Sequence, residues 1–376
     1  MVIFKNMSKF FYLYALTLLL CLSPILSYAD STKPYHGYMG FSPWPSDLTT
    51  EALDRTYDFI EQNGNLIAHH FDAGLPWEEA LHNKPYPQHL INDWNWRLHK
   101  TPQDHAILVS ITPLNFERKG LALYWNNKGD GQPLPPKWAA KKLNDPDIKK
   151  AFLSHALKVV QTFKPDFLAI AIEANVLISH KPELWQDYLE LNSYVYNGLK
   201  KRHPKLKVFA TVQYEHLRGI ENDSKENLPM QIPAVKQLMK HCDYLALSTY
   251  RYGFIHPNPP KDDYFDIALG FGKPIVISET GAISKTTMVM GLPLISNQKL
   301  QAEFLDMILR NAVKHNFAFV VNWTSIDFDP MLKRLPKEAR EIAKLWVHTG
   351  LLKVDGTPKK AYKIWRSYLP SKTKTP

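Results

Sequence analysis

Two stretches of sequence decide the fold: LAIAIE at Leu168–Glu173 and PIVISE at Pro274–Glu279. Both are apolar at successive positions, as is YLALST at Tyr244–Thr249. This pattern is typical of parallel strands that are covered on both faces. Runs of this kind alternate along the chain with longer segments of helical period, which indicates βαβ architecture.

Eight candidate strands can be counted outward from these two stretches. They are Gly37–Phe41, Leu66–Phe71, Ala106–Thr112, Phe167–Glu173, Lys207–Gln213, Tyr244–Tyr250, Pro274–Glu279 and Phe317–Trp323. The helices expected between them are Thr50–Asn63 closed by Gly64, Asp147–Phe163, Glu183–Arg202, Pro233–His241 and Asn297–His315, with a short one within Tyr264–Phe271. Asn297 is of a residue type that caps helix N-termini, so we expect it to cap the helix that follows it.

This alternation predicts an α/β protein with one closed (β/α)8 TIM barrel as a single domain. An open doubly wound sheet is disfavoured because no GxGxxG follows the first strand. The segment between the third and fourth predicted strands is longer than the other connections, and its extra residues are Leu114–Trp138. In a barrel it rises from the face where active sites are built, so we expect it to form a substrate wall.

The first 29 residues are typical of a cleavable secretory signal, with basic Lys5 and Lys9, an apolar run at Phe10–Leu22 and a small residue before Asp30. A retained N-terminal anchor is the alternative interpretation. We therefore expect a signal peptide at 1–29, a barrel at 30–370 and a basic tail at 371–376, in a chain exported to the periplasm or the extracellular space.

Composition excludes several other classes of protein. The net charge of +10 falls to +8 without the signal, and the basic residues do not concentrate into one patch or arm, so we expect no nucleic-acid partner. We also expect a monomer with no stable membrane insertion after signal cleavage. Removing the signal leaves Cys242 as the only cysteine, which excludes an intramolecular disulfide.

Glu173 and Glu279 end two of the predicted strands, 106 positions apart. That separation is about three βα units and matches strands 4 and 7, which face each other across a barrel. Two such carboxyl groups can cleave a glycosidic bond: one protonates the leaving oxygen and the other attacks the anomeric carbon. In enzymes that retain configuration they stand about 5 to 5.5 Å apart.

Four motifs resemble the retaining glycoside hydrolases of the clan A (β/α)8-barrel superfamily, with no individual family assigned. IEANV at Ile172–Val176 looks like their strand-4 motif, and ISETG at Ile277–Gly281 looks like their strand-7 motif. VNWTSID at Val321–Asp327 is similar to their strand-8 end, and TGLLKVDGTPKKAYKIW at Thr349–Trp365 to their closing pattern. The resemblance implies a carbohydrate substrate and no metal or other cofactor.

By this resemblance Glu173 would be the general acid/base and Glu279 the nucleophile. The superfamily usually has asparagine directly before the acid/base, where it binds the substrate 2-hydroxyl, and here that position is Ile172. Asn175 substituting by geometry, a different mode of substrate recognition and a degenerate binding cleft all stay open.

Other residues at strand ends are expected around this pair. The resemblance implies that Tyr250, with Tyr252 as its rival, hydrogen-bonds the nucleophile. Gln213 is expected on the rim as a substrate contact. Glu215 is a competing third carboxylate or the partner of an arginine, Arg218 or Arg251.

Histidines and tryptophans complete the expected site. Alternation along the strand directs one of His69 and His70 inward, and we expect His70 to contact substrate. A flat indole ring can stack on the apolar face of a sugar, and this role is expected of tryptophans at strand ends: Trp323 above all, then Trp44, Trp77 and Trp125.

These residues favour a retaining glycoside hydrolase acting on a poly- or oligosaccharide. One alternative is a catalytically silent barrel that binds carbohydrate. The other is a metal-dependent hydrolase using His69 or His70 with Asp72, which is disfavoured because the HxH ligand pattern of barrel metallohydrolases is missing.

Overall fold

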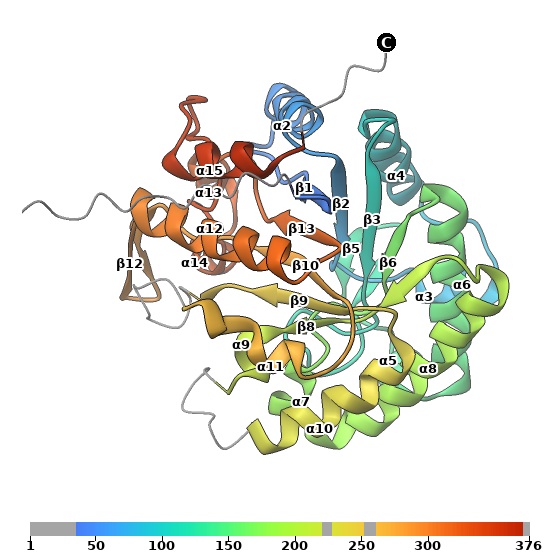
Figure 1. The fold of residues 1–376 in the computed structure, drawn as a ribbon. Helices are drawn as coiled ribbons and strands as arrows, with labels where there is room; N and C mark the ends of the chain where they lie inside the picture. The colour runs from blue at the N-terminus through green and yellow to red at the C-terminus, as the bar shows by residue number, and fades with distance from the viewer. Residues whose placement is uncertain (1–34, 220–227, 252–260, 371–376) are drawn as a thin grey trace, which may run out of the picture. The chain divides into compact units, whose positions relative to one another are not determined.

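A computed structural model describes residues 35–219, 228–251 and 261–370. Its centre is a sheet of parallel strands surrounded by helices (Figure 1). The strands are β1 (Tyr38–Phe41), β2 (Leu66–Phe71), β3 (Ala106–Ile111), β6 (Phe167–Ala169), β7 (Lys207–Phe209), β8 (Thr211–Gln213), β9 (Leu245–Thr249), β10 (Ile275–Thr280) and β13 (Phe319–Asn322).

The sheet closes into a barrel. Its order is β7-β6-β3-β2-β1-β13-β10-β9-β8, and every neighbouring pair is parallel. The two outer members, β7 and β8, are separated in sequence only by Ala210, so they are halves of one strand that pairs with β6 on one side and β9 on the other. Counting them as one gives the eight strands of a (β/α)8 barrel, and the fold prediction is confirmed.

The helices of the outer layer match most of the expected ranges. They are α2 (Thr50–Asn63), α3 (Trp77–His82), α4 (Gln88–Lys100), α5 (Pro136–Ala139), α6 (Pro146–Phe163), α7 (Val176–His180), α8 (Trp185–Arg202), α9 (Tyr214–Leu217), α10 (Leu228–Leu238), α11 (Asp266–Leu269), α12 (Gln298–Lys314), α13 (Asp329–Arg334), α14 (Lys337–Ala343) and α15 (Lys360–Tyr368). The side chain of Asn297 accepts from the backbone N–H groups of Lys299 and Leu300, so it caps α12 as predicted.

Two predicted elements differ from the structure. Regular strand geometry in β6 ends at Ala169, not at Glu173, because the chain bends after that residue. The backbone N–H groups of Ile170 and Ala174 still donate to the neighbouring strand, to Phe209 in β7 and Thr211 in β8. The helix expected to begin at Pro233 begins at Leu228 instead and carries Pro233 inside it. The start was predicted at Pro233 because proline is common in the first turn of a helix.

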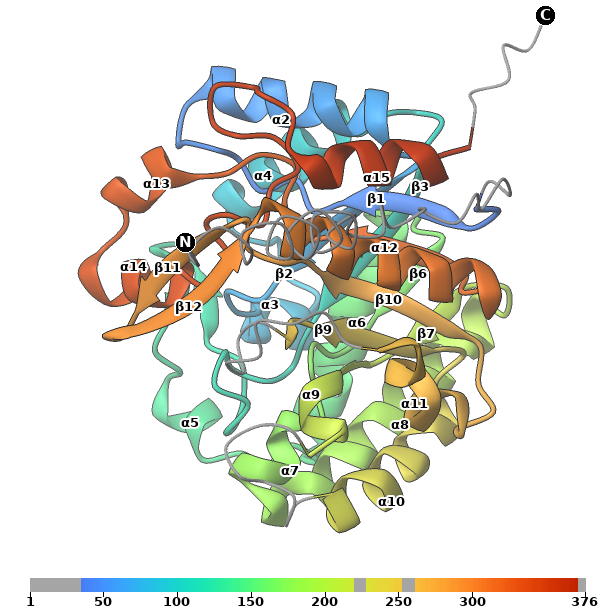
Figure 2. The same cartoon turned by 60° about the vertical axis from the view of Figure 1, so that its left-hand side comes forward.

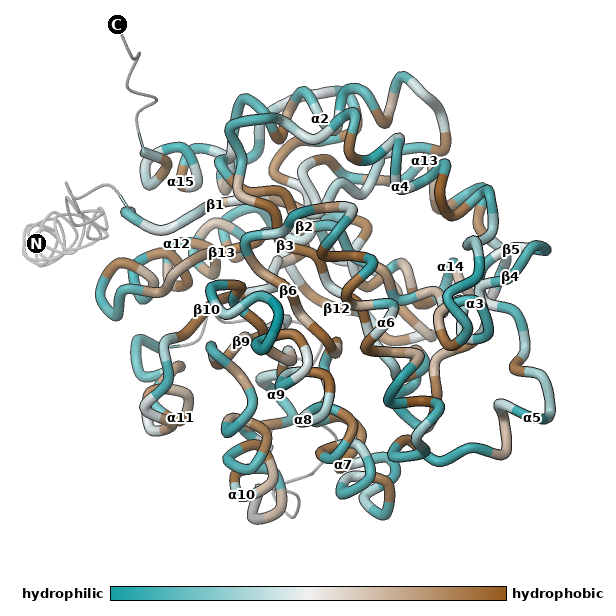
Figure 3. Tube along the Cα trace, turned by 90° about the vertical axis from the view of Figure 1, so that its right-hand side faces the viewer, coloured by the Kyte–Doolittle hydropathy of each residue, from teal (hydrophilic) through white to brown (hydrophobic). Residues whose placement is uncertain are grey.

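Hydrophobic residues are concentrated along the central strands, and hydrophilic segments lie on the surrounding helices and loops (Figure 3). The C-terminal helix α15 completes this core. Trp365 is fully buried, packs against Phe41 with ring centroids 4.7 Å apart and donates to the backbone oxygen of Asn63 at 2.7 Å. Residues near the two ends of the described chain are thereby held together.

Two hairpins rise from the loops that follow strands. β4 (Tyr124–Asn126) and β5 (Gly129–Gln132) lie within the long loop after β3, and β11 (Lys285–Val289) and β12 (Leu292–Asn297) follow β10. Figure 2 shows the second hairpin beside α13 and α14, and its buried Val289 and Leu294 pack with Leu345 beyond α14. Both hairpins therefore belong to the face of the barrel where the strands end.

The predicted signal peptide at 1–29 and basic tail at 371–376 lie outside the described residues. The described chain from Tyr35 onward belongs to one compact unit. Within it, no helix has the length and apolar character needed to cross a membrane.

Candidate active site

Glu173 and Glu279 meet at the rim formed by the C-terminal ends of the strands. Glu279 is the fifth residue of β10, and Glu173 follows β6 by four residues. Both side chains are partly exposed, 13% in the case of Glu279, although the strands that carry them are buried. The two groups are close enough for the charge of one to shift the titration of the other.

The backbone and the side chain of Glu173 are both held by hydroxyl groups. Its N–H donates to Thr211 Oγ1 at 2.7 Å, and its Oε1 accepts from Ser248 Oγ at 2.5 Å. Its φ of +49° is left-handed, a conformation that residues other than glycine seldom adopt. Strain of this kind collects at functional sites, and here it accompanies the bend that ends β6.

Glu279 is presented by an irregularity in its strand. The register of β10 shifts against both β9 and β13 around this residue, and bulges of this type re-aim side chains next to active sites. Tyr250 donates its phenolic hydrogen to Glu279 Oε1 at 2.6 Å, the contact that the superfamily resemblance implies. His70 Nδ1 lies 3.7 Å from Glu279 Oε2. Tyr252, the alternative to Tyr250 for this contact, lies outside the described residues.

The two glutamates share their electrostatic environment. Burial, and then the charge of Glu173, raise the pKa of Glu279 to about 8. Burial also raises the pKa of Glu173. Two neighbouring carboxyl groups with restricted access to water resist ionising together, so the titration of the pair belongs to both groups.

A buried arginine that sequence reasoning missed lies beside this pair. Arg118 is 3% exposed and forms a two-pronged ion pair with Asp72, at 3.1 and 2.8 Å. Its positive charge lowers the pKa of both glutamates, against the effect of burial. Arg118 belongs to the long loop after β3, and its φ of +53° is again left-handed. No spacing in the sequence links this loop to Glu173 or Glu279.

Glu215 does not compete for the cleft. It is fully buried below the rim and accepts from Thr249 Oγ1 at 2.6 Å, Gln213 Nε2 at 2.9 Å and the Tyr264 hydroxyl. Burial raises its pKa. The expected salt bridge to an arginine is not found among the described residues.

Arg218 instead lies over the Tyr264 ring, 4.4 Å from its centroid, and Arg251 lies 5.9 Å from the same centroid. Both arginines therefore lie near the phenol ring whose hydroxyl donates to Glu215. In the part of the chain that the structure describes, the Glu215 carboxyl group is bound by hydroxyl donors and not by an arginine as expected.

Asn175 and Gln213 lie elsewhere than expected. Asn175 is fully buried, and its amide bonds the backbone of Gln213 and the side chain of Gln231. The Gln213 side chain caps α9 by accepting from His216 N–H and also donates to Glu215. Both amides are fully engaged within the protein, so neither presents a group to the cleft.

The aromatic residues divide into two groups. His70, Trp323 and Trp44 form a continuous row: the His70 and Trp323 ring centroids are 5.2 Å apart, and those of Trp323 and Trp44 are 5.9 Å apart. All three are partly exposed. Burial lowers the pKa of His70 to about 4, so its imidazole is neutral near pH 7. Trp77 and Trp125, in contrast, are buried in the loop layer.

His69 and His70 point to opposite sides of β2, as strand alternation requires. His69 is fully buried and lies 2.9 Å from Thr101 Oγ1, behind the sheet. Asp72 is engaged by Arg118. The three residues of the metal-hydrolase interpretation therefore do not converge on one point.

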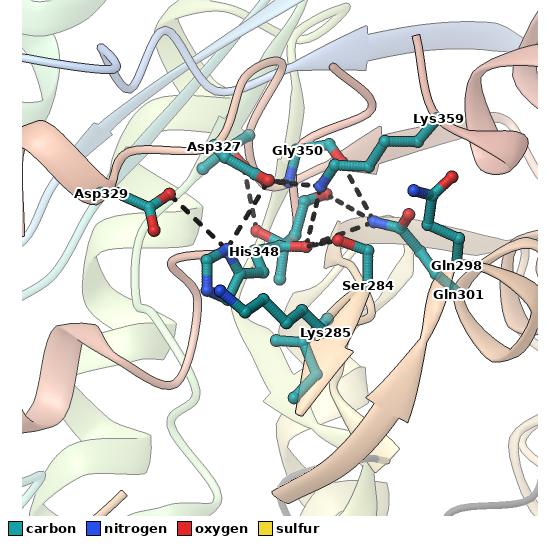
Figure 4. A network of polar contacts seen from close by, with 12 residues as sticks. Ser284, Lys285, Gln298, Gln301, Asp327, Asp329, His348, Gly350 and Lys359 are labelled. Atoms are coloured by element: carbon teal, nitrogen blue, oxygen red, sulfur yellow. Dashed lines mark hydrogen bonds and ion pairs between the residues drawn. The ribbon is translucent and has the colours of Figure 1, made fainter. Parts of the chain in front are cut away.

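Asp327, Asp329 and His348 are the one group in residues 35–219, 228–251 and 261–370 with metal-ligand geometry. The buried Lys359 binds one member of this group, Asp327 (Figure 4). Its ammonium lies 2.5 Å from Asp327 Oδ1 and donates to the backbone oxygen of Gly350 at 2.8 Å. The network joins the segment after Trp323 to the start of α15, and so fixes one wall of the rim.

Searches of sequence families and of curated proteins found no match for this chain. Solved structures match it by shape. An exo-β-1,4-mannosidase from Opitutaceae bacterium strain TAV5 aligns over 89% of this chain and 59% of its own length, at 14% identity and a TM-score of 0.59. The chain thus spans less than two thirds of that protein.

Two other structures align over most of both chains. The GH5_18 protein from Streptomyces cattleya, in complex with Manβ1-4GlcNAc, is covered over 82% of its chain and 90% of this one, at 13% identity and a TM-score of 0.60. Xylanase 10B from Thermotoga maritima is covered over 94% of its chain and 88% of this one, at 13% identity and a TM-score of 0.55.

The chain shares its (β/α)8-barrel fold with these three solved structures. This confirms the resemblance at the level of the fold.

Removal of the buried ammonium tests the role of the Lys359 network. We expect Lys359→Met to lower the free energy of unfolding by about 3 kcal/mol, because it leaves Asp327 buried without its partner. Urea unfolding followed by tryptophan fluorescence measures this. Lys360→Met removes the neighbouring exposed lysine and should change stability by less than about 0.5 kcal/mol. Equal stabilities for the two variants would contradict the assignment.

Proposed function

We propose that this chain is a retaining glycoside hydrolase that cleaves O-glycosidic bonds in a poly- or oligosaccharide. The arrangement of Glu173 and Glu279 is the main observation that supports this proposal. They come from opposite sides of the barrel, are partly exposed at its rim, and each has its Oε1 occupied by a hydroxyl donor. One oxygen of each carboxyl group is thereby left for the reaction.

In the first step Glu173 donates its proton to the glycosidic oxygen while Glu279 attacks the anomeric carbon. The bond from that carbon to the leaving oxygen breaks, and a covalent bond to Glu279 forms. The step requires the proton on Glu173 and the ionised form of Glu279, and two neighbouring carboxyl groups that resist ionising together favour a state with a single proton.

In the second step Glu173, now ionised, takes a proton from water. The water oxygen attacks the same carbon and releases Glu279, so the product keeps the original configuration. Tyr250 supports the nucleophile in both steps, because a hydrogen bond donated to a carboxylate stabilises its charged form. Arg118 acts on both glutamates through its charge, which lowers their pKa, while its hydrogen bonds go to Asp72 and to backbone oxygens of its own loop.

A carbohydrate substrate is supported by the row of His70, Trp323 and Trp44. Their rings are partly exposed beside Glu279, and flat aromatic rings pack against the apolar faces of sugars. The similar solved structures carry names that refer to mannose and xylose linkages. Both sugars therefore belong in a first substrate screen.

The test is to replace each glutamate after finding a responsive substrate among 4-nitrophenyl and 2,4-dinitrophenyl β-glycosides and plant, fungal and bacterial glycans. We expect Glu279→Gln to lose at least about 10⁴-fold in kcat. Glu173→Gln should lose about 10²-fold or more on nitrophenyl substrates and less on the dinitrophenyl ones, whose leaving group needs no proton. Exposed Glu183→Gln is the matched control.

Three results would contradict the proposal. Hydrolysis that survives both changes would exclude this pair. Glycan retention by the native chain with no released sugar would favour the silent binding barrel. Activity abolished by chelation and restored by metal would favour a metal-dependent hydrolase.

We also propose that the chain is exported and works outside the cytoplasm, because residues 1–29 have the layout of a signal peptide. Expression in a bacterial host followed by N-terminal sequencing tests this. We expect a mature chain in the periplasmic or extracellular fraction that begins near Asp30. A chain that keeps Met1 and sediments with membranes would indicate a retained anchor.

A further inference from the structure

The end of β9 carries three consecutive hydrogen-bond donors, each directed to a different glutamate. Ser248 donates to Glu173, Thr249 to Glu215 and Tyr250 to Glu279. Glu279 lies in β10, Glu173 follows β6 and Glu215 follows β8. One short segment therefore donates to all three of these glutamates, although only its tyrosine was expected to contact one of them.

Ser248 has a position that the other two donors lack. In the ladder between β9 and β10 it is the residue paired with Glu279, while its hydroxyl reaches across to Glu173 Oε1 at 2.5 Å. It is 1% exposed, so its hydroxyl is shielded from solvent. A single buried residue thus fixes the backbone position of one glutamate and the side-chain position of the other.

The other contacts of Glu173 do not hold its side chain in one orientation. Its backbone is bent into a left-handed conformation and held by Thr211 Oγ1, but that contact leaves the side-chain torsions free. Arg118 affects Glu173 only through its charge, since both of its terminal nitrogens bond Asp72. Ser248 is the only recorded hydrogen-bond donor to the Glu173 carboxyl group among the described residues.

We propose that Ser248 is a positioning residue for Glu173: by engaging Oε1 from the ladder position opposite Glu279, it directs Oε2 toward the bond to be cleaved. This inference rests on the proposed function for its catalytic meaning, since it assigns Glu173 the proton transfer. It adds a residue that the clan A resemblance did not point to. It also gives the two glutamates a common anchor, so a shift of β9 would displace both.

The hydroxyl has a second consequence for Glu173. A donor to a carboxylate stabilises the ionised form, and the Ser248 bond lowers the pKa of Glu173 against burial. Removing the donor must therefore move the titration of Glu173 to higher pH. Glu173 gives its proton in the first step, so the alkaline limb of the pH profile of kcat/KM would move the same way.

The experiment compares Ser248→Ala and Ser248→Thr with Ser284→Ala. Ser284 is also buried and donates to one backbone oxygen, that of His348, at 3.2 Å. Carbon-13 NMR of protein labelled at the glutamate carboxyl carbons follows each titration without any substrate. The Glu173 and Glu279 signals are those missing from Glu173→Gln and Glu279→Gln. Urea unfolding verifies that each variant is folded.

We expect Ser248→Ala to move the Glu173 midpoint to higher pH and the Glu279 midpoint by less, while Ser248→Thr and Ser284→Ala keep native values. Tyr250→Phe should move the Glu279 signal most. On the substrate found in the screen, Ser248→Ala should lower kcat about tenfold, the equivalent of one hydrogen bond to a charged group, with KM little changed. Ser248→Thr should restore the rate.

A folded Ser248→Ala variant with a native Glu173 titration would overturn the proposal. So would an equal displacement in Ser284→Ala, because it would show a general response to losing a buried hydroxyl. Failure of the proposed function would give a different result from failure of the Ser248 proposal. Hydrolysis would then survive in Glu173→Gln and Glu279→Gln, whatever the Glu173 titration in Ser248→Ala.

Discussion

Glu173 and Glu279 lie at one rim of this barrel, and Glu215 is buried below it. Removing carboxyl groups from water costs free energy, and that cost shapes the surrounding structure. Glu215 lies fully buried among hydroxyl and amide donors, while Glu173 and Glu279 stay partly exposed and couple to each other. The end of β9 provides a donor to each of the three. Burial raises the pKa of both partly exposed glutamates, and the hydroxyl donors lower it and occupy one oxygen of each. Protonation and orientation therefore depend on the same few contacts.

The Arg118–Asp72 ion pair places two opposite charges beside the cleft glutamates. The guanidinium lowers the pKa of Glu173 and Glu279, and the Asp72 carboxylate raises it. The ion pair comes from two loops on the same side of the barrel, after β2 and after β3, and these loops are joined by backbone bonds between Leu75 and the β4 segment. Left-handed backbone at both Arg118 and Glu173 indicates that the surrounding structure imposes these positions. The site is therefore built by rigid loops as well as by strand ends.

The sequence predicted the barrel and the placement of Glu279 and Tyr250, because parallel strand ends align at one rim whatever the loops do. Asn175 could not be placed in this way: the bend at Glu173 carries the following residues into α7 and away from the cleft. Trp125 was expected on the rim, but β4 pairs with β5 and buries it. Arg118 and Ser248 act through tertiary contacts that leave no periodic or spacing signal.

Covalent capture of the intermediate tests the central claim most directly. A 2-deoxy-2-fluoro glycoside with a dinitrophenyl leaving group, made with the sugar that the chain hydrolyses, slows breakdown of the glycosyl-enzyme more than its formation. Mass spectrometry of the digested protein then locates the added sugar. The account predicts one sugar per chain, attached to Glu279 in the peptide containing ISETG. A label on Glu173 or Glu215, or turnover of the reagent without any covalent label, would contradict it.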